Sequence, residues 1–329
     1  MVVSRDPMRA APLAFAALVA CAPVEEPATA VDAAPDPVVD PSPYVVEDTG
    51  ESATPSMSAE DVAAGITRAF AAALSVDPRD LADAYEGIWA ERDDPACPYY
   101  YPEYLTLYNQ YIWSADCTSE AGATFDGYAY YQGYRDYDGG YYTYDRYFYL
   151  YTSAATLTRS DGQRLTGSGY AYYYDIDYYA YAYRAAYEQI QGTFKWEGDS
   201  FEDSWLSRGI SMDLYLYTYR YDSGALYTTL TGSLADIDDT VTAVNFDSVY
   251  LENAATGTSC AAEPGGAVRL RDSAGTWYEV SFDGPAYSGA PSFPAYCDGC
   301  GSVYWRGDYL GEACPDFTAL TGWQERPWE

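Results

Sequence analysis

The sequence predicts an all-β fold, a long antiparallel meander that is rolled or barrel-like and is preceded by a short helical hairpin. The first observation is that tyrosine and other strand-forming residues alternate with a period of two from about residue 96 onward. The second is that short glycine-containing turn signals separate these stretches. Spacers of this length join only antiparallel neighbours, because a parallel crossover needs a dozen or more residues.

Two helices are expected ahead of the strands, within residues 58–94. Ser58 and Asp61 have the spacing of a capping box, in which each side chain bonds to the other residue's backbone N–H. The apolar residues that follow on one helical stripe are Val62, Ile66, Phe70 and Leu74. Asp77 and Pro78 mark a second start, because proline suits the first turn of a helix. The charged segment "ERDD" ends this second helix.

The strands are predicted from alternation and from the turns between them. The strand-like stretches are 104–108, 123–134, 141–153, 155–160, 164–174, 178–184, 192–198, 210–221, 225–234, 241–251, 267–272, 276–282 and 302–307. The turn signals are 138–140, 161–162, 222–224 and 273–275. Closing or rolling such a sheet would remove its exposed edges.

Six of the seven cysteines are expected to form disulfides: Cys97, Cys117, Cys260, Cys297, Cys300 and Cys314. Proximity pairs Cys97 with Cys117 and Cys300 with Cys314, and each pair would close its own hairpin; this leaves Cys260 for Cys297. Two alternatives stay open. The CxxC of Cys297 and Cys300 has redox spacing, although a glycine and a predicted strand follow it instead of the helix N-terminus or cations that lower a thiol pKa. The last four cysteines have spacing suited to zinc, although oxidation outside the cytoplasm competes with metal binding.

A short apolar run near the N-terminus indicates a secretory signal. Arg5 and Arg9 precede "APLAFAALVA", which is too short to span a bilayer. The run ends in Leu18, Val19, Ala20 and Cys21. This ending resembles the lipobox of bacterial lipoproteins, and the resemblance implies cleavage before Cys21 and acylation of that cysteine. Since Ala22 rather than aspartate follows, it also implies the outer membrane. An ordinary secretory signal with a chance cysteine is the alternative.

The predicted organisation has four parts. Residues 1–20 form the lipoprotein signal peptide, and residues 21–57 form an acidic tether rich in proline and alanine. This tether contains no Lys or Arg after Cys21, and it has too little apolar surface to offset the entropy of ordering. Residues 58–94 form the helical segment, and residues 95–329 form a tyrosine-rich, disulfide-stapled β domain.

The composition excludes several classes of function. The net charge is −33, whereas nucleic-acid binding needs a basic footprint. The chain has no histidine, which removes the commonest general base and any Ser-His or Cys-His pair. We therefore expect no cofactor, no metal and no catalytic residue that depends on histidine. Carboxylate chemistry and calcium binding remain, because both need only oxygen groups.

Three acidic groups are candidate sites for carboxylate chemistry or calcium binding. They are Asp136 with Asp138, Asp175 with Asp177, and Asp236 with Asp238 and Asp239. None completes the DxDxDG pattern of a calcium loop. We expect all three groups to lie in turns, where aspartate bonds to its own backbone.

Rows of alternating tyrosines are the most distinctive feature of the chain. The ten tyrosines in the three clearest rows are Tyr147, Tyr149, Tyr151, Tyr179, Tyr181, Tyr183, Tyr215, Tyr217, Tyr219 and Tyr221. Because successive strand residues point to opposite faces, the rows are expected to merge into one aromatic face. Tyrosine suits a half-wet surface, so a structural role is the simplest interpretation. The same face is a candidate binding surface for a glycan or partner.

The sequence thus predicts a lipid-anchored cell-envelope protein of the outer membrane with a binding or structural surface role. Its orientation toward the periplasm or the exterior stays open. The expected contacts are the membrane, through the lipid anchor alone, and a glycan or envelope protein at the tyrosine-rich face. An enzyme is the less favoured class. The alternative function is a carboxylate-based glycan hydrolase, with or without calcium.

Overall fold

The computed structural model describes residues 54–92, 96–101, 109–253, 263–284 and 298–323. The predicted signal peptide, Cys21 and nearly all of the predicted tether lie outside the described residues. Within the described residues, no helix is both long enough and apolar enough to cross a membrane. Ser56 and Met57, at the predicted end of the tether, already contact the folded part, where both backbone N–H groups donate to the hydroxyl of Tyr278.

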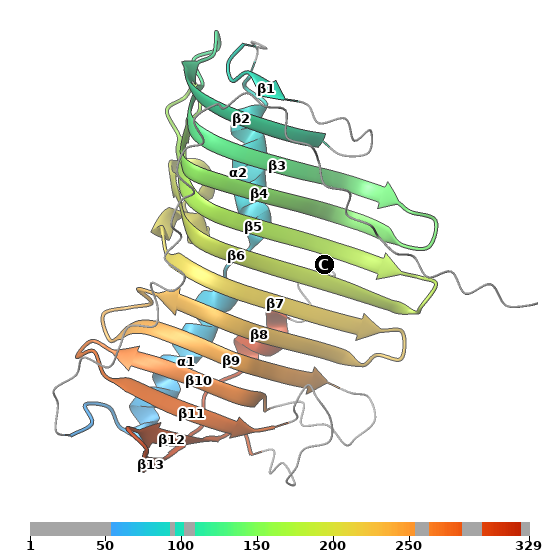
Figure 1. Ribbon diagram of the computed structural model, residues 1–329. Coiled ribbons are helices and arrows are strands. Elements are labelled where there is room, and N and C mark those ends of the chain that lie inside the picture. Colours follow the sequence, from blue (N-terminus) through green and yellow to red (C-terminus); the bar gives the residue numbers. More distant parts are fainter. Residues whose placement is uncertain (1–53, 93–95, 102–108, 254–262, 285–297, 324–329) are drawn as a thin grey trace, which may run out of the picture. The chain divides into compact units, whose positions relative to one another are not determined.

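The described residues form one antiparallel sheet in which each strand pairs with its neighbours in the sequence (Figure 1). The thirteen strands are β1 Tyr100–Tyr101, β2 Asn109–Thr118, β3 Thr124–Asp138, β4 Thr143–Thr158, β5 Arg164–Tyr178, β6 Tyr183–Glu197, β7 Ser211–Tyr221, β8 Leu226–Ala235, β9 Val241–Asn253, β10 Gly265–Asp272, β11 Trp277–Asp283, β12 Gly301–Trp305 and β13 Asp308–Ala313. The predicted all-β meander is confirmed. The sheet is open, because its order runs from β1 to β13 without pairing the two end strands.

Several strand boundaries differ from the prediction. β4 joins the predicted stretches 141–153 and 155–160, since Ala154 adopts a positive φ of 46° in a bulge that keeps the strand continuous. β6 includes residues 192–197 of the predicted stretch 192–198 and ends one residue before it. β1, β2 and β13 are not among the predicted stretches, and the predicted stretch 104–108 lies outside the described residues.

Glycine closes the hairpins that the turn signals predicted. Between β4 and β5, the Arg159 N–H donates to the Gln163 carbonyl, and Gly162 has a φ of 91°. Between β7 and β8, the Tyr221 N–H donates to Ala225, and Gly224 has a φ of 86°. Both are three-residue loops whose last residue is left-handed, a conformation that costs residues with a Cβ about 1–2 kcal/mol.

Two glycine-to-alanine changes are expected to alter stability in opposite directions. No atom lies within 4 Å of a Cβ added at Gly224 or at Gly87. Gly224→Ala meets only the left-handed backbone, so it should lower the free energy of unfolding by about 1 kcal/mol. Gly87→Ala lies in a helix and should raise it by about 0.5–1 kcal/mol. Urea denaturation measures both; a neutral Gly224→Ala would show that the loop relaxes.

Two helices precede the sheet, as predicted. α1 runs from Ala59 to Leu74 behind the predicted capping box of Ser58 and Asp61, and α2 runs from Pro78 to Trp89 with Asp77 as its N-cap. They lie one after the other along the sheet, instead of folding back on each other as the expected hairpin (Figure 1). A short third helix, α3, spans Thr318–Trp323 and packs against α1.

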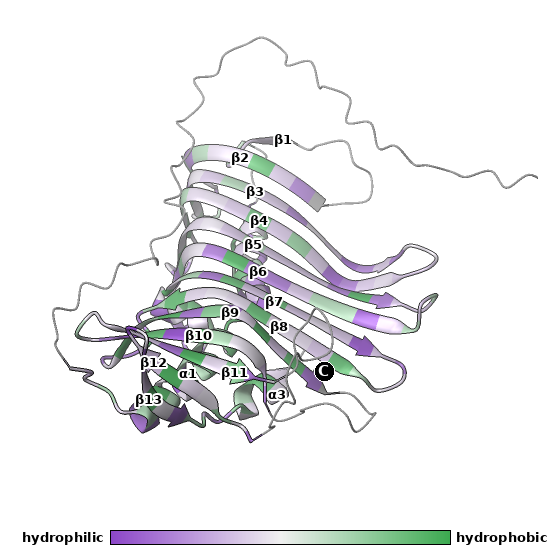
Figure 2. Cartoon of the chain, turned by 60° about the horizontal axis from the view of Figure 1, so that its bottom comes forward, coloured by the Kyte–Doolittle hydropathy of each residue, from purple (hydrophilic) through white to green (hydrophobic). Residues whose placement is uncertain are grey.

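All these helices cover one face of the sheet. α2 contacts β4, β5 and β6, while α1 contacts β9, β10 and β13. The core lies between the two layers. Phe70 of α1 is fully buried, and its ring lies 5.3 Å from that of Phe246 and 5.6 Å from that of Phe317. Under α2, the indole N–H of Trp113 donates to the Tyr85 hydroxyl at 2.9 Å. Along the strands, buried apolar residues that face the helices alternate with polar or tyrosine residues on the other face. The colours along the strands change accordingly (Figure 2).

Two disulfides are confirmed at the predicted positions. Cys97 is bonded to Cys117, which ties the segment before β1 to β2. Cys300 is bonded to Cys314, which ties the segment before β12 to the segment after β13. With Cys300 in a disulfide to Cys314, the redox pairing of Cys300 with Cys297 and the four-cysteine zinc site are both wrong. Cys260 and Cys297 lie outside the described residues.

Candidate functional site

The register of the strands brings the tyrosine rows together on the face opposite the helices. Tyr147 pairs with Tyr174 across β4 and β5, and Tyr187 pairs with Tyr217 across β6 and β7. We call this surface the tyrosine face; its tyrosines are Tyr128, Tyr130, Tyr134, Tyr144, Tyr147, Tyr149, Tyr151, Tyr170, Tyr172, Tyr174, Tyr183, Tyr187, Tyr215, Tyr217, Tyr219, Tyr221 and Tyr227. The predicted merging of rows into one aromatic face is therefore present.

The rings of the tyrosine face support one another across the strands. Tyr134 stacks on Tyr147 with ring centroids 4.6 Å apart, and Tyr174 stacks on Tyr187 at 5.2 Å. Most other neighbours meet edge to face, the arrangement that aromatic quadrupoles favour. Glutamines link some hydroxyls, as where the Tyr187 hydroxyl donates to the side-chain oxygen of Gln189 at 2.7 Å. The rings are thus held in place by one another and by these hydrogen bonds.

Two of the ten candidate tyrosines do not belong to this face. Tyr179 and Tyr181 were expected in a strand from 178 to 184, but they lie in the turn between β5 and β6. They are 54% and 70% exposed, respectively. The turn forms because Ala182 takes a left-handed φ of 57° and the Tyr181 N–H donates to the Tyr178 carbonyl. The other eight candidates lie on the tyrosine face.

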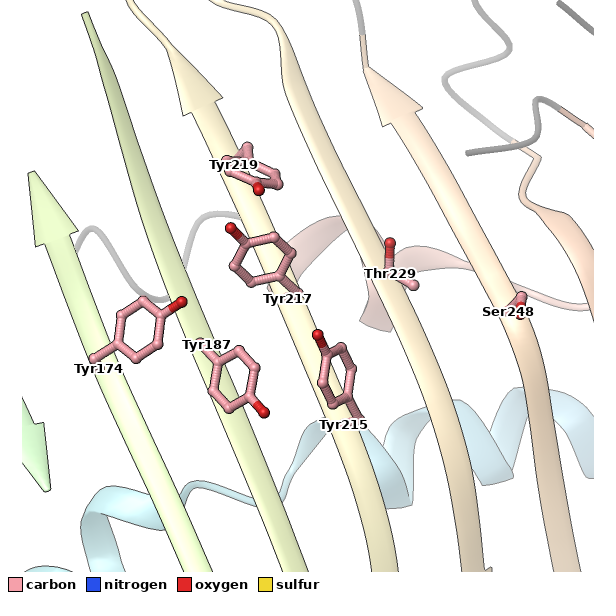
Figure 3. A pocket seen from close by; sticks show the side chains of 7 residues that line it. All are labelled: Tyr174, Tyr187, Tyr215, Tyr217, Tyr219, Thr229 and Ser248. Carbon is pink, nitrogen blue, oxygen red and sulfur yellow. The ribbon is translucent and has the colours of Figure 1, made fainter. Parts of the chain in front are cut away.

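A groove of about 460 Å³ opens on the tyrosine face. Its lining residues are Tyr174, Tyr187, Tyr215, Tyr217, Tyr219, Thr229 and Ser248. Tyr174 of β5 and Tyr187 of β6 lie on one side of the β7 tyrosines, and Thr229 of β8 and Ser248 of β9 lie on the other (Figure 3). The groove exists because the small side chains of Thr229 and Ser248 lie next to a wall of large tyrosine rings. Its volume falls in the range of small-molecule sites.

Tyr187 and Tyr217 of the groove are uncharged at ordinary pH. Burial raises the pKa of Tyr217, and its hydrogen bond with Tyr219 acts in the same direction. Burial also raises the pKa of Tyr187 to about 12. The lining therefore offers hydroxyl groups that both donate and accept hydrogen bonds, on rings that are partly exposed. None of its seven described residues is charged.

Sequence reasoning identified only part of this groove. Tyr215, Tyr217 and Tyr219 were among the candidate residues, whereas Tyr174 and Tyr187 were not. Tyr174 ends a run of three consecutive tyrosines, in which alternation does not reveal the face; Tyr173 in fact points toward the helices and is fully buried. Thr229 and Ser248 carried no signal in the sequence, and only the pairing of strands brings them to this place.

The acidic groups in loops serve the fold. The Asp138 carboxylate accepts the Gly140 N–H at 2.8 Å, as expected of a turn. Asp238 accepts the N–H groups of Thr240 and Val241 and pairs with Arg68 of α1 at 2.6 Å. Burial alone would raise the pKa of Asp238, but these hydrogen bonds lower it. Asp136 lies in β3 with a φ of 53°, a correction to its expected place in a turn. Among the described residues, no group of three or more acidic or cysteine side chains is arranged to hold a metal ion.

The expectation for Asp175 and Asp177 is also wrong. Both lie within β5, because the strand continues to Tyr178. The Asp175 side chain is buried under the helices, where it accepts the backbone N–H of Arg146 at 2.7 Å and the hydroxyl of Tyr173 at 3.2 Å. Asp177 instead pairs with Arg184. A buried carboxylate that holds two strands together is a structural group.

A second hollow, of about 220 Å³, lies near β11 and β12 beside the carboxyl groups of Glu263 and Asp283. Asp283 and Asp298 line it, and the neighbouring Glu263 side chain is fully buried. Burial and, after it, the hydrogen bond with Asp283 raise the pKa of Glu263 to about 7. Glycosidase carboxyls stand about 5–9.5 Å apart to admit a sugar or water, so a pair that shares a hydrogen bond lacks that geometry.

Glu263→Gln is expected to stabilise the protein at alkaline pH. The pKa of Glu263 is higher in the folded state than the ordinary value of 4.5, so the folded state favours the proton. Stability should therefore fall as pH rises from about 4.5 to about 7, and the glutamine variant should not show this fall. At about pH 8 it should exceed the wild type by about 2 kcal/mol. Urea denaturation at several pH values measures the difference. The control is Glu312→Gln, an exposed residue of the same hollow; parallel curves for wild type and Glu263→Gln would contradict the prediction.

Comparison with models of known protein families, with curated proteins and with solved structures found no match for this chain.

Proposed function

We propose that the protein is a lipid-anchored envelope protein that uses the tyrosine face to bind a glycan or an envelope partner. The groove among Tyr187, Tyr217 and Thr229 is the single observation that carries the binding role. A face of tyrosines with a purely structural role needs no hollow, since rings packed evenly over the sheet would cover it. Here five tyrosine rings lie beside two small hydroxyl side chains, Thr229 and Ser248, so that one side of the rings stays accessible.

Preorganisation supports the same role. Binding costs less when the contact groups are already fixed, and rigid tyrosines supply contact area at low entropic cost. Tyr217 contacts Tyr219 at a centroid distance of 4.2 Å, and Tyr187 contacts Tyr215 at 5.0 Å. These neighbours restrict the rings of the wall in the unliganded protein.

The anchoring part of the proposal is supported by the lipobox-like residues before Cys21. A chain held at the outer membrane meets glycans and envelope proteins as its neighbours. The membrane contact runs through the lipid alone in this proposal. Cys21→Ser removes the thiol that acylation requires, so the variant should leave the detergent phase in a partition experiment. Unchanged partitioning would overturn the anchor.

Binding is tested with the full chain carrying Cys21→Ser, which serves as the soluble form. The first measurement is a glycan array and a pull-down from envelope extract. Tyr217→Thr with Tyr219→Thr removes the wall and keeps a strand-forming residue at each position. Tyr149→Thr with Tyr151→Thr is the matched control, because these tyrosines lie on the same face outside the groove.

Loss of binding in the groove variant, with binding kept in the control and intact circular dichroism in both, supports the proposal. Equal binding by the groove variant and the wild type would leave the tyrosine face with a structural role alone. The absence of any glycan or envelope partner for the wild type would also refute the binding role.

A further inference from the structure

Resting on the proposed function, we infer that the groove takes an uncharged sugar unit of a neutral polysaccharide, with Thr229 as a specificity-determining residue. Seven described residues line the groove, and each of them bears a hydroxyl group. Five of the seven are also aromatic. A pyranose ring has the complementary surface, since its C–H face packs on an aromatic ring while its hydroxyls both donate and accept hydrogen bonds.

The charges around the groove exclude an anionic ligand. Asp213 precedes Tyr215 on the same side of β7, and it is close enough to Tyr170 to raise the pKa of that phenol after burial. Glu252 of β9 acts on Tyr227 in the same way. Both flanking charges are negative, in a chain whose net charge is −33. An acidic sugar would meet repulsion here without a compensating cation.

The nearest basic side chains of the central strands belong to the other face. Arg184 of β6 pairs in register with Arg220 of β7. Arg220 follows Thr218 by two residues, and Thr218 is buried on the helix side of the sheet. Strand residues two apart share a face, so both arginines lie on the side opposite the groove. Arg184 accordingly pairs with Asp145 and Asp177.

A cationic ligand lacks its usual partner inside the groove. Aromatic sites for cations gain much of their strength when rings enclose the charge, often with a carboxylate nearby. The lining has no carboxylate, and one of its sides is formed by Thr229 and Ser248 instead of rings. One aromatic wall beside a hydroxyl-bearing floor suits a flat, uncharged ring that stacks on one side and forms hydrogen bonds on the other.

Thr229 and Ser248 form this floor. The side chain of Thr229 is half-buried and stands next to the β7 wall, where Thr229 pairs in register with Tyr217. Thr229→Val keeps the shape and removes the hydroxyl, whereas Thr229→Trp fills the hollow and leaves all five tyrosines in place. Ser248 is unsuitable for this test, because its φ of 52° makes any bulky replacement strained.

The experiment is calorimetric titration of the full chain carrying Cys21→Ser with hexasaccharides. The neutral probes are the hexamers of glucose, mannose and xylose in their common linkages, and the anionic probe is hexagalacturonate. We expect at least one neutral hexamer to bind, with the same affinity at low and high salt and between about pH 6 and pH 8, because no acidic or basic side chain lines the groove. Thr229→Val should weaken binding by about tenfold, the worth of one hydrogen bond, and Thr229→Trp should abolish it.

Preferential, salt-sensitive binding of hexagalacturonate would overturn the neutral-sugar inference. If Tyr217→Thr with Tyr219→Thr then still removed that binding, the proposed function would stand with another ligand. Unchanged neutral binding in Thr229→Trp would move the sugar to another site and overturn the assignment of Thr229. Binding of no hexamer, combined with capture of an envelope protein that depends on Tyr217 and Tyr219, would reject the sugar and keep the proposed function.

Discussion

Phe70→Ala should lower the free energy of unfolding by about 3–5 kcal/mol, the usual cost of deleting a fully buried phenylalanine. The ring of Phe70 joins three parts of the protein, because it belongs to α1 and packs on Phe246 of β9 and on Phe317 just before α3. Its removal leaves a cavity between the helical layer and the sheet. Alanine is a good helix former, so the loss comes from packing and not from the helix itself.

The control for this change is Phe201→Ala. Phe201 is partly buried and its main aromatic contact is Trp196, at a centroid distance of 5.1 Å. Its loss should cost about 1–2 kcal/mol, because less apolar area returns to water. Urea denaturation followed by tryptophan fluorescence measures both variants. Equal effects at the two positions would mean that α1 does not form part of the cooperative core.

Removal of the disulfide between Cys97 and Cys117 should lower stability by about 3 kcal/mol through the greater freedom of the unfolded chain. The double change to alanine at these positions opens a loop of 20 residues. The double change at Cys300 and Cys314 opens a loop of 14 residues and should cost about as much, because the cost grows only with the logarithm of loop length.

Accessibility separates the two bridges. Cys97 is 4% exposed, whereas Cys314 lies at the surface. A phosphine reductant should therefore reduce the bridge between Cys300 and Cys314 first, as mass spectrometry of alkylated peptides will record. Faster reduction of Cys97 would contradict the buried position of that residue.

The fold class could be predicted because two signals agree over most of the chain. Alternation marks the strands, and glycine turns such as the one at Gly162 mark where the chain reverses. Alternation did not mark β13, because "DYLGEA" contains few strand formers; only the pairing of Cys300 with Cys314 predicted a hairpin there. It is a strand because it pairs with β12 and is tied to it by a disulfide.

The groove was less predictable than the sheet, because it depends on register. Alternation placed Tyr215, Tyr217 and Tyr219 on one face, which was correct. A register shift between Leu230 and Gly232 lies beside Ser248, whose φ is left-handed. This shift decides which residues of β8 and β9 lie next to the β7 tyrosines. Such a bulge arises from pairing between strands, and neither strand shows it alone.

The order of the strands also bears on how such a sheet acquires its size. Each strand bonds only to the strands before and after it in the chain, so contacts between strands remain local in sequence. Insertion or loss of one whole hairpin would change the number of strands in the sheet by two. The pairings between the other strands would stay the same, as in repeat proteins. A hairpin that bears tyrosines in the same phase would lengthen the aromatic surface by two more rows. The width of that surface is thus a property that gene duplication can adjust in discrete steps, without a new fold.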